Sequence, residues 1–240
     1  MKPLPAAFLF DLDDTILSLS QTATPAWEAL CQRFVDRIGQ VDAPGLFRSI
    51  QQAQERFWQR LEHQRMTDLA KARRSIVADA FRLAGLYDLE TAHDMADTFS
   101  RERLATIVPF EGAVETLERL RARGLRLALI TNGKSKTQRE KIEHFSLASL
   151  FDCIVVEEEF GVGKPNPRVF RHALGALGVT PAEAWMVGDN LAFDIAGAQP
   201  LGIHAIWHDV HGRGLPPESG VRPDRIIRSL TELLDEEGAS

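Results

Sequence analysis

The sequence predicts an α/β protein with a Rossmann-like parallel-sheet core, helices on both faces of the sheet, and an inserted four-helix cap domain. Short apolar runs alternate with amphipathic helical segments before Thr15 and after Pro109. Between these two regions the periodicity stays helical, without a convincing strand. We therefore expect a core formed by residues 1–17 and 108–240, and a helical cap over residues 18–107.

The first predicted strand ends on a cluster of carboxylates. Residues 6–10 are apolar, as in a strand buried on both faces, and Asp11, Asp13 and Asp14 follow directly. Carboxylates so close together repel unless a cation or a shared proton intervenes, and a hard divalent ion such as Mg²⁺ suits carboxylate oxygen. The alternative is a turn in which these residues only cap the next helix. We assign Asp14 to that turn, and Thr15 either caps it or supports Asp11.

The inserted segment predicts four amphipathic helices with short connections, which is typical of a small bundle. The first is expected to have Thr24 as its N-cap and Pro25 at its first helical position, and to end at Gly39. The other three are expected over residues 44–62, 67–85 and 90–104. Linkers to the core are expected near residues 17–23 and 107–110.

The rest of the chain alternates strands with helices, which predicts right-handed crossovers and one parallel sheet. Strands are expected at residues 125–130, 153–156, 184–187, 203–207 and, more weakly, 225–227. Helices are expected at residues 111–123, 135–145, 167–177 and 194–198, and after residue 227. Glycines and prolines around Lys164 predict an irregular loop there.

Polar residues follow successive predicted strands and should meet at one edge of the sheet. Because ligands bind outside the carboxyl ends of parallel strands, we expect a site at that edge. Its predicted members, in chain order, are Asp11, Asp13, Thr15, Thr131, Asn132, Lys164, Asp189, Asn190 and Asp194.

These residue types suit phosphoryl transfer. Asp11 would attack phosphorus and form an aspartyl-phosphate, and Asp13 would protonate the leaving oxygen and then activate water. Thr131 and the backbone N–H groups after it, beginning with Asn132, would hold phosphoryl oxygens. Lys164 would offset negative charge. Asp189 would complete the metal shell; Asn190 and Asp194 would support it, Asp194 directly or through water.

Each of these residues also has a purely structural interpretation. Thr131 could be a helix N-cap, Lys164 a solvated loop lysine, and Asp194 the N-cap of a short helix. His208 and His211 could bind a metal, but we expect them to be exposed in a loop. The basic residues 71–74 are interpreted as a solvated helix face.

Four motifs, DLDDT at 11–15, TNG at 131–133, GKPNP around Lys164 and GDNLAFD at 188–194, resemble those of the haloacid dehalogenase-like (HAD) hydrolase superfamily in order and spacing. The resemblance implies that Asp11 is the nucleophile and Asp13 the acid/base. It also implies Mg²⁺ bound by Asp11, the Asp13 main-chain carbonyl and Asp189. The helical insertion resembles the cap of type I members. Residues 111–133 and 160–170 look most similar to the nucleotidase-like and N-acylneuraminate-phosphatase-like branch.

The expected function is Mg²⁺-dependent hydrolysis of a small phosphomonoester of the nucleotide or sugar phosphate class. A phosphomutase shares the same acid pair and stays open as an alternative. A dehalogenase usually lacks an acid at the position of Asp13, and a phosphonate hydrolase would need a cap lysine, for which only Lys71 is available. A catalytically retired binding module is disfavoured because every motif residue is intact.

Composition and charge limit the classes of partner and the cellular compartment that we expect for this protein. The net charge of −6 disfavours nucleic acid as a partner, and no apolar stretch is long enough to span a membrane. We expect a cytoplasmic monomer or homodimer that acts on a small phosphorylated metabolite. Cys31 and Cys153, far apart and flanked by apolar residues, predict neither a disulfide nor a zinc site.

Overall fold

The computed structural model describes residues 5–60 and 69–234. The chain divides into an α/β unit, formed by Met1–Ser18 and Val108–Ser240, and a helical unit formed by Leu19–Ile107.

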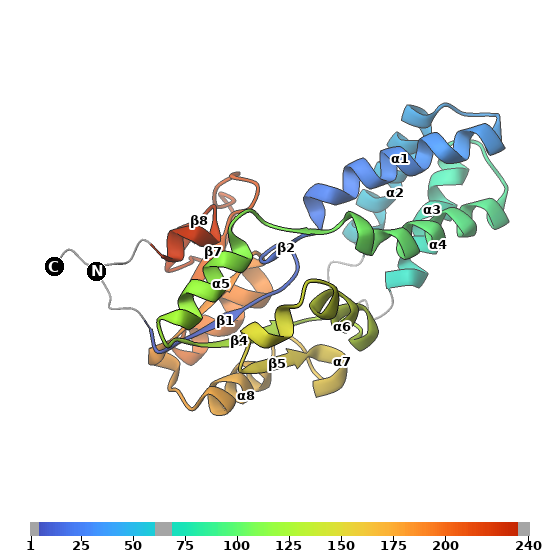
Figure 1. Ribbon diagram of the computed structural model, residues 1–240. Helices are drawn as coiled ribbons and strands as arrows, with labels where there is room; N and C mark the ends of the chain where they lie inside the picture. The colour runs from blue at the N-terminus through green and yellow to red at the C-terminus, as the bar shows by residue number, and fades with distance from the viewer. Residues whose placement is uncertain (1–4, 61–68, 235–240) are drawn as a thin grey trace. The chain divides into compact units, whose positions relative to one another are not determined.

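The α/β unit is built on a six-stranded sheet in which every neighbouring pair is parallel (Figure 1). The spatial order is β5-β4-β1-β6-β7-β8, so the chain builds outward from β1 to one side and then returns to build on the other. The carboxyl end of β1 is therefore a topological switch point, where open α/β sheets bind ligands. The strands are β1 (Ala7–Phe10), β4 (Arg126–Thr131), β5 (Cys153–Val156), β6 (Ala184–Gly188), β7 (His204–His208) and β8 (Arg225–Ile227).

Helices cover both faces of this sheet, as the sequence predicts. Figure 1 shows α5 (Ala113–Ala122) and α8 (Pro167–Leu177) on opposite sides of the strands. Side chains alternate between the faces: Leu9 belongs to the same buried cluster as Phe170 of α8. Phe8 and Phe10 point the other way, and their rings lie 5.6 Å apart. Burial on both faces explains why β1 is apolar at every position.

The helical unit contains α1 (Ser20–Ile38), α2 (Ala43–Arg60), α3 (Leu69–Leu83) and α4 (Leu89–Thr106). Its core is a cluster of apolar residues from all four helices. Within this cluster the rings of Trp27 in α1 and Phe99 in α4 stack with centroids 3.7 Å apart. Asp88 caps α4 by accepting the backbone N–H of Thr91. Each helix therefore turns an apolar stripe toward one shared core, as the helical periodicity of the sequence predicts.

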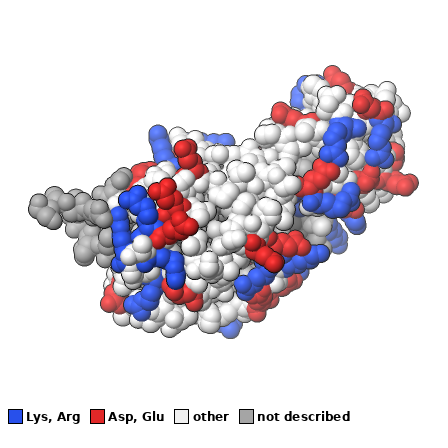
Figure 2. All heavy atoms as spheres, viewed as in Figure 1, with Lys and Arg blue, Asp and Glu red and all other residues white. Residues whose placement is uncertain are grey.

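The surface of the helical unit carries charges of both signs side by side, as Figure 2 shows. Ion pairs join α1 to α4 and α3 to α4: Arg33 with Glu102, Arg37 with Asp94, and Arg74 with Asp97. Exposed pairs of this kind contribute little to stability, because solvent screens the two charges. Among the described residues, no helix is both long and apolar enough to cross a membrane.

The start of α1 differs from the prediction. The helix begins at Ser20, and Pro25 lies inside it rather than at its first position. The Leu19 carbonyl already accepts the N–H of Ala23, 3.1 Å away, so a helical turn forms before the expected N-cap at Thr24. Proline has a helix-compatible φ, but as the sixth residue of this helix it removes one backbone hydrogen bond and crowds the carbonyl four residues before it. The predicted start of the third helix at Thr67 lies outside the described residues.

Four further parts of the chain differ from the expectations. A two-stranded antiparallel pair, β2 (Leu17–Ser18) and β3 (Val108–Pro109), forms where two linkers were expected. A short helix, α7 (Glu157–Phe160), precedes the irregular loop around Lys164. The segment expected as a helix at 194–198 begins as a π-helical turn at Leu191–Ile195 and continues as α9 (Ala196–Ala198). Of the expected C-terminal helix, the residues described up to 234 form a 3₁₀ turn at Leu230–Leu233.

Truncating Leu9 tests the central position of β1. Leu9 is fully buried, so Leu9→Ala should lower the free energy of unfolding by roughly 2–5 kcal/mol, through lost burial and a cavity. Ile226→Thr in β8 is the control: that side chain is 44% exposed, and the change should cost less than about 1 kcal/mol. Urea unfolding followed by Trp fluorescence measures both. Equal effects of the two substitutions would contradict the assignment.

Candidate active site

The turn after β1 places Asp11 beside the end of β6. The Thr15 hydroxyl donates a hydrogen bond to Asp11 Oδ2 at 3.0 Å, and it accepts the backbone N–H of Asp189 at 3.1 Å. Asp14 adopts a φ of 60°, which short polar residues tolerate in turns. Thr15 therefore supports Asp11 and joins the two strand ends, and Asp14 occupies the turn as expected.

Lys164 lies buried between two carboxylates. Its Nζ is 2.5 Å from Asp11 Oδ1 and 2.6 Å from Asp194 Oδ1, and its side chain is 3% exposed. Although burial alone would lower the pKa of Lys164, the two carboxylates raise it above its ordinary value. Lys164 is thus a charged, buried group, which excludes its interpretation as a solvated loop lysine.

The Asn132 side chain holds the loop that carries Lys164. Its Oδ1 accepts the backbone N–H of Lys164 at 2.8 Å, and its Nδ2 donates to the Lys164 carbonyl at 2.9 Å. Gly163 allows this approach, because a Cβ there would lie 2.5 Å from Asn132 Oδ1. Since the Asn132 amide is engaged with the loop, any phosphate contact by this residue falls to its main chain.

Two acids following β6 complete a carboxylate cluster. Oxygens of Asp11, Asp189 and Asp194 lie within 4.8 Å of one another. Asp194 Oδ2 accepts the backbone N–H of Asn190 at 2.9 Å, and Gly188 makes room, because a Cβ there would lie 2.3 Å from the Asp194 carboxylate. Asn190 Oδ1, rather than Asp194, caps the following turn by accepting two backbone N–H groups at 3.0 Å. The N-cap interpretation of Asp194 is therefore wrong.

The cluster carries an excess of negative charge, because three carboxylates surround one lysine. Burial raises the pKa of Asp11 to about 7; Lys164 opposes this rise, and Asp194 and Asp13 add to it. Burial, followed by the charges of Asp11 and Asp194, raises the pKa of Asp189 to about 9. A cation would relieve this repulsion. The donor atoms are all carboxylate oxygens, which fit a hard divalent ion such as Mg²⁺.

A second polar group surrounds Asp13, and the sequence reasoning missed two of its members. Lys141 Nζ lies 2.5 and 2.6 Å from the two Asp13 carboxylate oxygens, and Gln138 Nε2 is 3.0 Å from one of them. Both residues come from α6 (Ser135–His144). Gln138 and Lys141 are buried at the helical spacing of a core stripe, together with Ile142. The sequence did offer a signal: in the helix that follows TNG, Gln138 and Lys141 stand at the spacing of the apolar stripe that includes Ile142.

Two other predictions concern side chains outside the cluster. His208, expected to be exposed, is buried at the end of β7, with its ring edge-on to Phe110 at 5.4 Å between centroids. Burial lowers its pKa and so favours the neutral ring. His211 is exposed, as expected. In the basic run, Lys71 and Arg74 are exposed, but Arg73 is half-buried and lies over the ring of Phe99.

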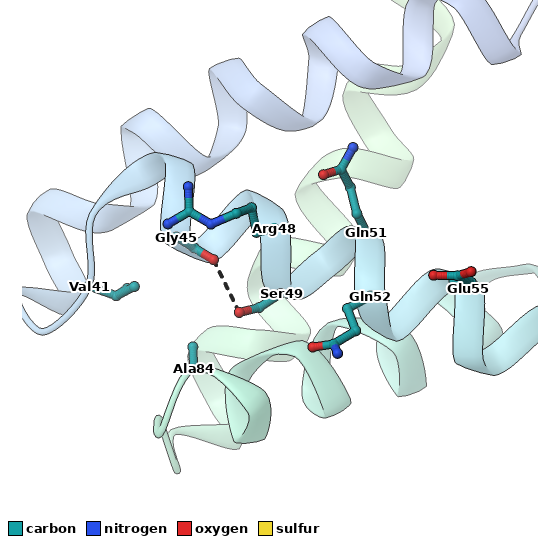
Figure 3. Close-up of a pocket in the computed structure, with 8 residues that line it drawn as sticks. All are labelled: Val41, Gly45, Arg48, Ser49, Gln51, Gln52, Glu55 and Ala84. Atoms are coloured by element: carbon teal, nitrogen blue, oxygen red, sulfur yellow. Dashed lines mark hydrogen bonds between the residues drawn. The ribbon is translucent and has the colours of Figure 1, made fainter.

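A polar hollow of about 630 Å³ lies in the helical unit (Figure 3). The Ser49 hydroxyl donates to the Gly45 carbonyl at 3.1 Å, and Arg48 and Glu55 supply the charges of the lining. The hollow contains none of the predicted site residues and no group of three or more acids, histidines or cysteines. We therefore place the candidate active site at the carboxylate cluster.

Comparison with known families agrees with this geometry. The family model described as haloacid dehalogenase-like hydrolase matches residues 5–202, which include every predicted site residue. The chain belongs to this family. Membership confirms the resemblance of the four motifs, and it accounts for an acidic switch point on a parallel sheet.

Relatives of this hydrolase include several phosphatases. A phosphoserine phosphatase from Thermus thermophilus is 36% identical, covering 94% of this chain and 96% of its own length. An N-acylneuraminate-9-phosphatase from Rattus norvegicus is 44% identical over 110 residues, which are 45% of this chain and 44% of that protein. The HAD hydrolase YfnB from Bacillus subtilis, solved bound to magnesium, has a TM-score of 0.76 at 24% identity and covers 97% of this chain and 98% of its own. This likeness confirms the predicted fold class.

Gly188→Ala tests the close approach of Asp194 to the end of β6. The new Cβ would overlap the buried carboxylate, so we expect a loss of roughly 1–3 kcal/mol in the free energy of unfolding. Gly175→Ala, inside α8 with open space around it, is the matched control and should be neutral or stabilising by about 0.5–1 kcal/mol. Chemical denaturation compares the two variants. A neutral Gly188→Ala would contradict the geometry.

The raised pKa of Asp189 predicts a pH-dependent response to metal. Between the ordinary pKa of 3.8 and about 9, the folded protein holds a proton that the unfolded chain has lost. Without metal, this group's contribution to stability therefore falls as the pH rises through that window. Mg²⁺ competes with the proton, so it should raise the melting temperature more at about pH 8 than at about pH 6.

Differential scanning calorimetry with Mg²⁺ or EDTA measures this response. Asp189→Asn, which removes the titrating group, should abolish most of the Mg²⁺ shift. An equal or larger shift at the lower pH in the unmodified protein would contradict the prediction.

Proposed function

We propose that this hydrolase is a Mg²⁺-dependent phosphatase of small phosphomonoesters that works through an aspartyl-phosphate on Asp11. The observation that carries the proposal is the buried contact of Lys164 with Asp11 inside a carboxylate cluster at the switch point of the sheet. The phosphatase names of its relatives support the same reaction class.

The first half of the reaction transfers the phosphoryl group to the protein. An oxygen of the Asp11 carboxylate attacks phosphorus while the bond from phosphorus to the ester oxygen breaks. Thr15 holds the other Asp11 oxygen, and Lys164 offsets the negative charge of the nucleophile and the phosphoryl group. The Thr131 hydroxyl, buried at the end of β4, would hold a phosphoryl oxygen. Asp13 donates its proton to the departing ester oxygen.

The second half returns the protein to its starting state. The Asp13 carboxylate takes a proton from water as the water oxygen attacks phosphorus. The bond between phosphorus and Asp11 breaks, which regenerates the Asp11 carboxylate and releases inorganic phosphate. The proton that Asp13 takes from water replaces the one that it gave to the ester oxygen, so the cycle closes without a net change.

Asp11, Asp189 and the main-chain carbonyl of Asp13 are the groups that would hold Mg²⁺. When bound, the ion supplies positive charge that stabilises the phosphoryl oxygens. Both oxygens of Asp194 have partners in the protein, Lys164 and the Asn190 N–H. We therefore assign Asp194 a supporting role through Lys164.

The substrate is proposed to be a small phosphorylated metabolite of the sugar phosphate or nucleotide class, and the relatives add phosphoserine to the candidates. Asp13 supplies the proton that an alkoxide leaving group needs, so an alkyl phosphomonoester fits the site. A dehalogenase would have no comparable use for that acid. A phosphomutase would transfer phosphate to an isomeric product instead of releasing it, and the test below separates the two outcomes.

Phosphate release from a panel of nucleotide monophosphates, sugar phosphates and phosphoserine tests the proposal. Asp11→Asn should lower kcat by at least about 10³-fold, because the nucleophile is lost, and EDTA should abolish turnover reversibly. Glu118→Gln, which changes an exposed acid on α5, is the control and should retain wild-type rates. Activity surviving in Asp11→Asn or in EDTA would overturn the mechanism, and phosphate transfer without release would favour the mutase.

A further inference from the structure

Two side chains of helix α6 contact the Asp13 carboxylate. Lys141 Nζ contacts both of its oxygens, at 2.5 and 2.6 Å, and Gln138 Nε2 donates to Oδ2 at 3.0 Å. An ammonium placed against both oxygens fixes the plane of the carboxylate as well as its position. The Asp13 side chain is 30% exposed to solvent. The contacts with Lys141 and Gln138 therefore restrain a carboxylate that is otherwise partly open.

Lys141 is poorly explained as a stabilising ion pair. Its side chain is 4% exposed, and among the described residues the ion pair recorded for it is the one with Asp13. Burying a lysine carries a desolvation penalty that a single pair offsets only in good geometry, so buried pairs contribute little net stability. Lys136, on the same helix, shows the ordinary arrangement: it is 87% exposed and lies 4.0 Å from Glu140.

Gln138 connects Asp13 to Thr131. Its amide nitrogen lies within hydrogen-bond distance of Asp13 Oδ2, the Thr131 hydroxyl oxygen and, at 3.0 Å, the Asn132 carbonyl. All three partners can accept, which sets the orientation of the amide. Because the Thr131 oxygen accepts from Gln138, the Thr131 hydroxyl proton is available for a phosphoryl oxygen. One helix thus orients the proton-transfer group and the phosphate-binding hydroxyl together.

We propose that Lys141 and Gln138 are positioning residues that hold the Asp13 carboxylate in place for both of its proton transfers and fix its position relative to Thr131. The proposal deepens the phosphatase function given above and rests on it. Lys141 would act through the Asp13 carboxylate that it contacts, and Gln138 would act through Asp13 and Thr131.

The leaving group provides a readout that a purely structural role would not change. Hydrolysis of an alkyl phosphomonoester needs Asp13 in both halves of the reaction, because an alkoxide requires a proton as it leaves. p-Nitrophenyl phosphate needs Asp13 only in the second half, since nitrophenolate leaves unprotonated. Displacing Asp13 should therefore slow the two substrates at different steps.

Lys141→Met is compared with the matched variant Lys136→Met on p-nitrophenyl phosphate and on the alkyl phosphomonoester that the wild type hydrolyses fastest. Lys141→Met should lower kcat on the alkyl substrate about 10- to 100-fold while KM changes less than about 3-fold. On p-nitrophenyl phosphate it should give a rapid burst of nearly one nitrophenolate per protein and then slow turnover. Lys136→Met should behave as the wild type, and Lys141→Arg, whose guanidinium can contact both oxygens, should recover most of the rate.

A second variant keeps the test independent of folding in Lys141→Met. Gln138→Met leaves the ion pair in place but removes the link to Thr131, so it should raise KM and also produce a burst. The absence of a burst in both variants would overturn the positioning role while leaving the phosphatase assignment intact. A wild-type protein that turned over no phosphomonoester would overturn both proposals.

Discussion

The structure of the site depends on burying the Lys164 ammonium between Asp11 and Asp194. A buried lysine is tolerated only where carboxylates pair with it closely, and breaking such a pair typically costs several kcal/mol. The surrounding sequence serves this requirement. Asn132 holds the Lys164 main chain through two hydrogen bonds, and Gly188 gives the Asp194 carboxylate room beside the end of β6. Segments that follow β4, β5 and β6 thus converge on one charge.

The strand order gives these segments a common meeting point. β1 lies at the centre of the sheet, between β4 and β6, so the residues after all three strands reach the same edge. Two aspartates two residues apart then have separate partners: Asp11 contacts Lys164 from the loop after α7, and Asp13 contacts Lys141 from α6. In the proposed mechanism the nucleophile and the proton-transfer group are therefore held by different parts of the chain. Each can be oriented for its own task.

Most helices and strands could be predicted from the local hydrophobic periodicity of the sequence. The strand Cys153–Val156 and the helix Pro167–Leu177 lie where periodicity predicted them, because burial on two faces or along one stripe leaves a readable repeat. The predicted start of α1 was wrong. The prediction relied on a local signal, a proline after a threonine, but helical hydrogen bonds already begin at the Leu19 carbonyl. The pair β2 and β3 was missed because its strands are two residues long and nearly ninety residues apart in the chain.

The sequence by itself determined the chemical types at the switch point, since the residues after each strand can be read in order and parallel strands share one carboxyl edge. Only the tertiary structure decided which groups contact which. Lys141 is 128 residues from Asp13 in the chain, and Lys164 is 153 from Asp11. No local periodicity records such pairings. The same limit applies to His208, whose burial depends on Phe110 and on the Arg228 carbonyl rather than on the glycines and prolines beside it.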